Sequence, residues 1–208
     1  GPGTKVQLLI DSDVFCKLGI AGLLEDAIAL LGASPATSGR LPALPHMLRR
    51  GSLVRTYGDA ACVKLLPLTG TIPPIPAADP TWLDKTAQVP SIDPGEAQLF
   101  ASAAADGLLV LTGDKRALLA LKDIEGFETA LAGRIVVFEA LLLALCDTLG
   151  APEVTRRLQP LIPSDKTLRV CFSDGETDPR EGLLSYFRNL ATEAAPLLLW
   201  QPPLGGSE

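Results

Sequence analysis

The sequence predicts an α/β protein in which a parallel β-sheet is covered by helices on both faces. Three short aliphatic runs read as buried strands, and a helical pattern follows each of them at once. The strands are predicted at Val6–Ile10, Leu108–Leu111 and Ile135–Phe138, and the helices at residues 14–31, 115–122 and 140–149. Nearly continuous apolar strands that alternate with helices are typical of a parallel sheet buried on both sides. Residues 168–172 form a fourth, weaker strand candidate.

The remaining segments are less regular. Repeated prolines divide residues 35–80 into short pieces, with brief helices predicted at 44–50 and 59–66 and an extended loop at 69–78. Beyond Gly150 the clearest prediction is a last helix at 179–192. We expect residues 4–149 to form one domain and residues 150–208 to form a C-terminal extension packed on it.

Composition excludes several classes of protein. The chain has 208 residues, 47% of them hydrophobic, so it can bury a core and is not disordered for lack of apolar surface. Its formal net charge of −6 argues against a broad basic surface for coating nucleic acid. The most apolar stretch, residues 135–146, contains Glu139 and is too short to cross a bilayer, so no membrane association is expected.

The cysteines and the histidine argue against a zinc site. Four cysteines are far apart in the sequence, and His46 is the only histidine. We expect buried, reduced thiols and a cytoplasmic location. His46 as a general base is an alternative to a packed or surface histidine.

Acidic residues follow two of the predicted strands. Asp11 comes directly after the first strand, with Asp13 two residues on, and Asp114 follows the strand at 108–111. Ligand sites in open α/β sheets gather at the carboxyl ends of the strands, so these carboxylates are expected to converge if the two strands are neighbours.

Glu96 is the third acid of this group. In a helix over residues 93–106, Glu96 lies in line with the apolar residues Leu99 and Phe100. A carboxylate on an apolar face is costly unless a cation or a donor meets it. Converging carboxylates are ligands for a hard divalent cation such as Mg²⁺ or Mn²⁺.

A purely structural interpretation of each acid stays open. Asp93 and Glu96 fit a capping box around Pro94, and Asp114 and Asp13 could cap the helices that follow them. Asp11 has no such helix to cap, which favours convergence.

Two blocks of the sequence resemble PIN-domain proteins. The first is Leu8–Phe15 with the glycine-containing segment that follows, and the second runs from Asp93 through residues 101–105 to Ala117. The resemblance implies a three-layer α/β/α sandwich and Mg²⁺- or Mn²⁺-dependent endoribonuclease activity. By position, Asp11, Glu96 and Asp114 match the metal-binding, catalytic acids of the family, and Asp13 falls at a more variable polar position. Many small bacterial members are toxins of toxin–antitoxin modules that an antitoxin holds inactive, and homodimers are common.

The chain departs from the family in one respect. Most active members carry a further acid, usually Glu, on the helix after the second strand, whereas no acid lies between Asp26 and Asp59 here. The acid-free segment 40–55 is instead basic and is our candidate for facing RNA. The predicted RNA contacts are Arg49 and Arg50 in this segment and Lys115 and Arg116 after Asp114.

Two other functions stay open. The run from Ile10 to Val14 also fits the start of haloacid-dehalogenase-like phosphatases, with Asp11 as nucleophile and Asp13 as acid/base. The missing acid after the second strand motivates the other alternative, a catalytically degenerate PIN-like module that binds protein or RNA.

Overall fold

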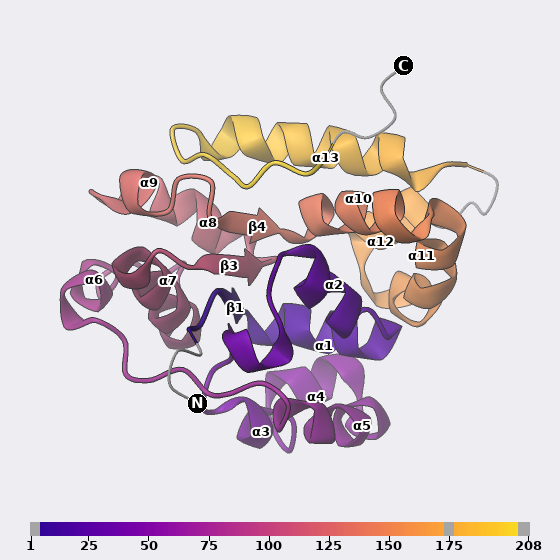
Figure 1. Ribbon diagram of the computed structural model, residues 1–208, viewed down its shortest axis with the longest axis horizontal. Helices are drawn as coiled ribbons and strands as arrows, with labels where there is room; N and C mark the ends of the chain where they lie inside the picture. The colour runs from indigo at the N-terminus through magenta and orange to yellow at the C-terminus, as the bar shows by residue number, and fades with distance from the viewer. Residues whose placement is uncertain (1–4, 173–176, 204–208) are drawn as a thin grey trace.

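The computed structural model describes residues 5–172 and 177–203 (Figure 1). Its centre is a four-stranded, wholly parallel sheet with the strand order β2-β1-β3-β4. The strands are β1 (Leu8–Ile10), β2 (Ser38–Gly39), β3 (Leu109–Thr112) and β4 (Ile135–Val137). The predicted α/β fold with a parallel sheet is confirmed.

The strand order creates a switch point between β1 and β3. From β1 the chain moves outward to β2, and it later returns to place β3 and then β4 on the opposite side of β1. Connections therefore leave β1 and β3 in opposite directions, which opens a crevice at their carboxyl ends. Asp11 continues the pairing past the end of β1, because its backbone N–H donates to the Leu111 carbonyl at 3.0 Å.

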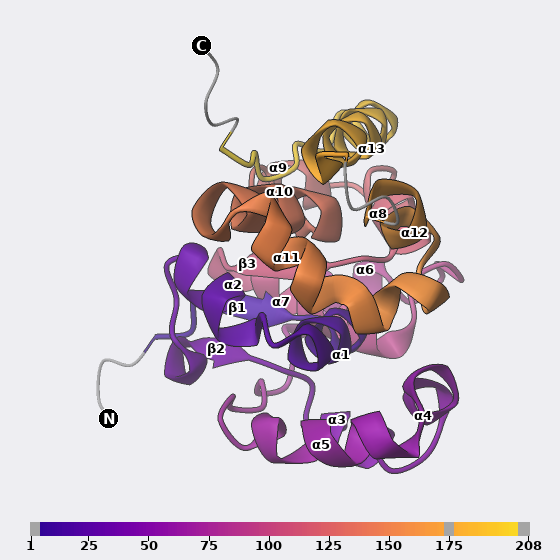
Figure 2. The ribbon, with the colours of Figure 1, turned by 90° about the vertical axis from the view of Figure 1, so that its right-hand side faces the viewer.

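Helices pack on the sheet and on one another, an arrangement compatible with a three-layer α/β/α sandwich (Figures 1 and 2). Helix α7 packs on β1 and β3, and α1 also packs on β3. Further helices cover these in turn, α5 on α1 and both α6 and α9 on α7. These helices are α1 (Ser12–Ala21), α5 (Asp59–Thr69), α6 (Pro80–Lys85), α7 (Pro94–Asp106) and α9 (Phe127–Ala130).

The sequence predicts one helical stretch over residues 14–31, but the structure has two helices there, α1 and α2 (Leu24–Leu30). Gly22 ends α1 in the left-handed conformation, with φ 68°, and its backbone N–H donates to the Gly19 carbonyl. A glycine adopts this conformation without the strain that a Cβ atom would bring.

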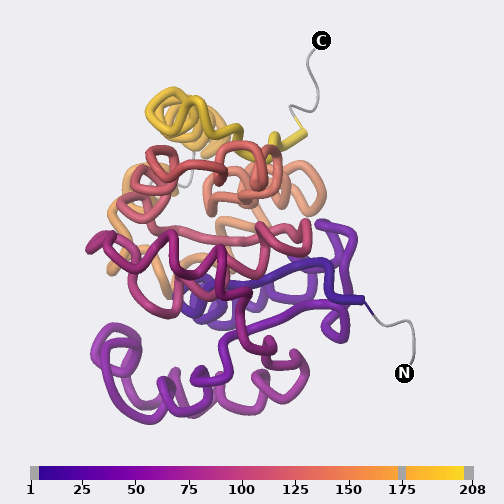
Figure 3. The backbone as a smooth tube through the Cα atoms, turned by 90° about the vertical axis from the view of Figure 1, so that its left-hand side faces the viewer, coloured from indigo at the N-terminus to yellow at the C-terminus, as the bar shows by residue number. Residues whose placement is uncertain are grey.

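Within the segment between β2 and α7, the helices α3 (Leu44–Met47), α4 (Ser52–Tyr57) and α5 form a small lobe on the β2 side of the sheet, whereas α6 lies against α7 (Figures 1 and 3). The brief helices predicted there are present as α3 and α5, whereas α4 and α6 were not predicted. The two-residue strand β2, preceded by the short 3₁₀ helix η1 (Pro35–Thr37), was not predicted either. Such short elements lack the apolar periodicity that identifies longer ones.

The predicted strand at residues 168–172 is wrong, because this segment is helix α12 (Lys166–Phe172). Its short, mostly apolar run suggested a strand. In the helix, Leu168, Cys171 and Phe172 are buried at i, i+3 and i+4, while Val170 is 61% exposed.

Beyond Gly150, residues 151–172 and 177–203 pack closely on the rest of the chain. Helix α10 contacts both α11 and α13, and α13 also contacts α8. At the free edge of β4, Trp200 N–H donates to the Ile135 carbonyl and Gly133 N–H donates to the Leu198 carbonyl, each at 2.9 Å. The elements concerned are α8 (Lys115–Leu121), α10 (Phe138–Leu149), α11 (Ala151–Leu158), the 3₁₀ helix η2 (Gln159–Ser164), α12 and α13 (Pro179–Ala194).

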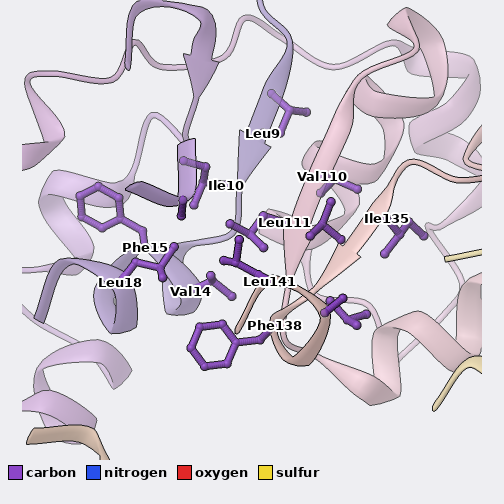
Figure 4. Close-up of a cluster of buried hydrophobic side chains, with 14 of the residues drawn as sticks. Leu9, Ile10, Val14, Phe15, Leu18, Val110, Leu111, Ile135, Phe138 and Leu141 are labelled. Atoms are coloured by element: carbon purple, nitrogen blue, oxygen red, sulfur yellow. The ribbon is translucent and has the colours of Figure 1, made fainter. Parts of the chain in front are cut away.

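The core is mainly aliphatic. Side chains from β1, β3, α1 and α10 meet in one cluster, which includes Ile10, Phe15, Leu111 and Leu141 (Figure 4). All six phenylalanines of the chain are buried, so its few aromatic residues are concentrated in the interior. The four cysteines are buried free thiols. Over the described residues, no helix is both long and apolar enough to span a bilayer.

Candidate functional site

A cavity of about 850 Å³ opens at the carboxyl ends of β1 and β3, at the switch point of the sheet. Five acidic residues line it, from three separate segments of the chain. They are Asp11, Asp13, Asp93, Glu96 and Asp114. The structure therefore brings together all four of the acids predicted from the sequence and adds Asp93.

The expectation that Asp13 caps the first helix and that Asp11 has none to cap is wrong, because α1 begins at Ser12, which puts Asp11 at the N-cap position and Asp13 in the first turn. The side chain of Asp11 nevertheless makes no capping hydrogen bond. Burial, together with the charges of Asp13, Asp93 and Asp114, raises the pKa of Asp11 from 3.8 to about 7. Ionisation of Asp11 at neutral pH therefore costs free energy in the folded protein, and a nearby cation would reduce that cost.

Asp93 and Glu96 form the predicted capping box at the start of α7. Asp93 Oδ1 accepts from Glu96 N–H at 2.8 Å, and Glu96 Oε1 accepts from Asp93 N–H at 3.0 Å. This cap uses one oxygen of each carboxylate and fixes the rotamer of Glu96. The structural and functional interpretations of these residues are thus compatible, because each carboxylate keeps a second oxygen.

Glu96 and Asp114 form a carboxyl pair across the cavity. Glu96 is only 6% exposed. Burial and a hydrogen bond with Asp114 raise the pKa of Glu96 well above its usual range. Asp114 also caps α8, since its Oδ1 accepts from Ala117 N–H at 3.1 Å. A divalent cation between these two carboxyl groups could stabilise the charged form of Glu96.

Asp13 lies at the rim and is held by two neighbours. Tyr57 Oη donates to Asp13 Oδ1 at 2.5 Å, and Lys17 Nζ lies 3.5 Å from Asp13 Oδ2. Lys17 also donates to Asp165 Oδ2 at 2.8 Å, which ties α1 to the start of α12. Asp13 is therefore positioned by its neighbours and is 45% exposed in its side chain.

The opposite wall of the cavity carries no charge. The helices after β2 contribute Ala43, Met47, Ser52 and Thr56. Ser12 faces the same wall and donates to the Met47 sulfur at 3.9 Å. None of the four residues that these helices contribute is acidic, so the carboxyl groups of the cavity all come from its other walls.

The predicted RNA-contacting residues are distributed unequally. Lys115 and Arg116 line the cavity, although Lys115 Nζ is paired with Glu193 Oε1 of α13 at 3.0 Å. Arg49 and Arg50 are exposed between α3 and α4, near Met47 but outside the lining of the cavity. His46, likewise exposed, is not among the lining residues.

Arg40 does not belong to the basic segment proposed to face RNA. It is 9% exposed, and its guanidinium donates to the backbone carbonyls of Leu41, Thr69 and Ile72 at 2.9–3.1 Å. It stabilises the loop beside β2, so the exposed basic surface begins only at Arg49.

The acidic residues of the cavity are of the type that binds a hard divalent cation, but their side chains are not arranged around one point. Throughout residues 5–172 and 177–203, no three His, Cys, Asp or Glu side chains are grouped as a ready metal site. The donor set consists of carboxylate oxygens, which Mg²⁺ and Mn²⁺ prefer. Asp11, Glu96 and Asp114 would hold the ion, whose charge would oppose the burial that raises the pKa of Glu96.

Asp93 is the functional candidate that sequence reasoning missed. We treated it only as a cap, yet its charge contributes to the raised pKa values of both Asp11 and Glu96. The signal was present, because Asp93 and Glu96 are three residues apart at the start of one helix. Gln98 also lines the cavity and was not singled out.

Replacing Asp93 by alanine is expected to cost about 1 kcal/mol of stability through loss of the cap. Asp79→Ala is the matched control, since Asp79 caps α6 through Trp82 N–H at 3.1 Å and is not among the residues that line the cavity. Only Asp93→Ala should also lower the pKa of Asp11, as seen by NMR titration of the carboxyl carbons. Equal titration of Asp11 in both variants would contradict a role for Asp93 in the cluster.

Comparisons of the chain with protein-family models, with curated proteins and with solved structures found no match, so the candidate site is supported by the geometry and chemistry of these residues alone.

Proposed function

We propose that this protein is a PIN-like, metal-dependent endoribonuclease that hydrolyses phosphodiester bonds of RNA. The observation that supports this most is the convergence of Asp11, Glu96 and Asp114 in one cavity at the switch point of the sheet. The raised pKa values of Asp11 and Glu96 add to it, since they mark carboxyl groups that a bound cation would stabilise in the charged form.

The chemistry assigned to the residues is simple. A bound Mg²⁺ or Mn²⁺ lowers the pKa of a coordinated water and neutralises charge on the phosphoryl oxygens. Asp11, Glu96 and Asp114 hold the ion, and Asp13 at the rim orients the attacking water. Arg116, with Lys115 when it is released from Glu193, contacts backbone phosphates. Arg49 and Arg50 extend this contact beyond the cavity.

An assay of RNA cleavage with Mn²⁺ tests the proposal. Asp11→Asn and Asp114→Asn should each reduce cleavage of a mixed RNA at least a hundredfold, because each removes a ligand charge. Asp106→Asn is the matched control, since Asp106 is exposed at the far end of α7 and should leave cleavage unchanged. Cleavage that survives in both cavity variants would exclude this site as the nuclease centre.

The uncharged wall formed by Ala43, Met47, Ser52 and Thr56 favours a second candidate function. A PIN-like module without catalysis would bind RNA or protein through the same surface. Calorimetric titration with Mg²⁺ and Mn²⁺ separates the two. Binding that Asp11→Asn abolishes supports the nuclease, and no binding at millimolar concentrations supports the module.

The phosphatase alternative is disfavoured by the position of Asp13. Tyr57 and Lys17 both donate to its carboxylate, so Asp13 acts as a hydrogen-bond acceptor, which suits the orientation of a water but not the proton donation that a phosphatase requires. This alternative also leaves Glu96 on the cavity wall without a role.

The remaining features follow from the likeness to PIN-domain proteins. We propose a cytoplasmic protein of the toxin type that an antitoxin or another protein partner restrains, and that forms a homodimer. Copurification of a small partner that suppresses cleavage would test the restraint, and light scattering would test the dimer.

A further inference from the structure

A second cavity of about 340 Å³ adjoins the acidic one. The two share Gly113, Asp114 and Lys115, which form the wall between them. The C-terminal extension supplies much of the second lining. Its contribution consists of Thr167 from α12 and Tyr186, Asn189, Leu190 and Glu193 from α13.

The lining combines a flat aromatic side chain with hydrogen-bonding groups. Tyr186 is half-buried, and Asn189 on the same helix offers both an amide donor and an acceptor. Nucleobases in single-stranded RNA are bound in this way, by stacking on an aromatic ring and by hydrogen bonds to the base edge. A cavity of this volume lies in the range of pockets that hold a small ligand.

Glu139 supplies this cavity with a carboxyl group that forms no ion pair within the residues that the structure describes. It follows β4 in the first turn of α10 and is half-buried. Burial raises its pKa, and beyond its own backbone N–H the described chain gives its carboxyl group no hydrogen bond. Asp165 opposes its charge, while Lys17 and Lys115 favour it. A half-buried carboxylate of this kind is suited to accept N–H donors from a ligand.

We propose that this second cavity binds a guanine base of the RNA, next to the phosphate that the acidic cavity holds. The inference rests on the proposed nuclease function. Guanine presents two adjacent N–H donors, which one carboxylate can accept together, and its carbonyl oxygen can accept from Asn189. Since the wall between the cavities is only Gly113–Lys115, a nucleotide covalently joined to the bound phosphate reaches the second cavity.

Nucleotide binding tests the site without requiring cleavage. The full chain carrying Asp11→Asn is titrated with guanosine and uridine monophosphates and followed by ¹⁵N NMR. Guanosine monophosphate should shift the amides around Tyr186 and Asn189 and bind about tenfold more tightly than the uridine nucleotide. Glu139→Gln and Asn189→Ala should each remove most of that preference. Glu181→Gln, an exposed substitution on the same helix, should not.

Mapping of cleavage sites in RNA distinguishes the two proposals. Cleavage beside guanines that becomes indiscriminate in Glu139→Gln supports both. Cleavage with no base preference, unchanged in Glu139→Gln, overturns the guanine site and leaves the nuclease standing. Guanine-selective binding that depends on Glu139, in a protein that cleaves no RNA, supports the base site and overturns the nuclease.

Discussion

Asp11→Asn is expected to raise the stability of the protein at pH 8 by roughly 4 kcal/mol while it abolishes metal-dependent cleavage. The folded-state pKa of Asp11 is raised to about 7 from 3.8, first by burial and then by neighbouring carboxylates. Its contribution to stability is therefore full below about pH 4, falls as the pH rises, and is lost above about pH 7. Asparagine has a similar shape and carries no charge, so it removes this penalty.

Thermal unfolding as a function of pH measures the effect. In a chain of this size, the expected gain raises Tm by about 10 °C at pH 8 and by much less at pH 4. Asp106→Asn, at the exposed end of α7, should show no such dependence. If Tm of Asp11→Asn were equal to or lower than that of the wild type at pH 8, Asp11 would not be a strained carboxylate.

The same experiment with a divalent cation links stability to function. Mg²⁺ or Mn²⁺ at millimolar concentration should raise Tm of the wild type at pH 8, because the ion stabilises only the folded state. The rise should be smaller at pH 5, where protons compete with the ion for Asp11 and Glu96. Asp11→Asn should lose most of this response. Functional sites often lower the stability of the free protein in this way, and binding of the ligand compensates for the loss.

Lys17→Met is expected to destabilise the protein by about 2–3 kcal/mol. Lys17 is 20% exposed and lies between the carboxylates of Asp13 and Asp165, the second of which is 13% exposed. Burial opposes the charge of Lys17, but the two carboxylates outweigh it and hold its pKa above the usual value. Removing the ammonium leaves both acids without their cation and detaches the start of α12 from α1.

Denaturant unfolding of a double-mutant cycle measures this link. Lys17→Met and Asp165→Asn should be far from additive, with a coupling of about 1–2 kcal/mol. Lys166→Met, an exposed neighbour of Asp165, should change stability by less than about 0.5 kcal/mol. Additive effects would show that the ion pair of Lys17 and Asp165 does not contribute to attaching the extension.

The local pattern of apolar and polar residues was sufficient to predict most of the long helices and the carboxyl ends of β1 and β3. The apolar runs in the sequence were sufficient to predict β1, β3 and β4. Once these strands were predicted, the acids directly after β1 and β3 could be placed at the carboxyl ends of the strands. The Asp93–Glu96 box was likewise legible, because capping depends on residues three apart. The strand predicted at residues 168–172 was wrong because a short apolar run also fits a helix that buries positions i, i+3 and i+4.

The partners of individual polar side chains could not be predicted. We treated Arg40 as an exposed arginine, but its guanidinium donates hydrogen bonds to backbone carbonyls of a loop that lies more than 25 residues away in the sequence. We predicted that Lys115 contacts RNA, but its ammonium forms an ion pair with Glu193, which lies far away in the sequence. Such pairings depend on which surfaces the fold brings together, and no periodicity in the sequence encodes them.

By itself, the sequence determined the class of fold and the residue types of the candidate site, because hydrophobic periodicity and helix caps are local properties. Only the tertiary structure decided that β1 and β3 are neighbours, and hence that Asp11, Glu96 and Asp114 share one cavity. It also decided that α12 and α13 wall a second cavity beside the first. The physical reason is that the charge and burial of a carboxylate depend on atoms contributed by distant segments, and packing of the whole chain sets those distances.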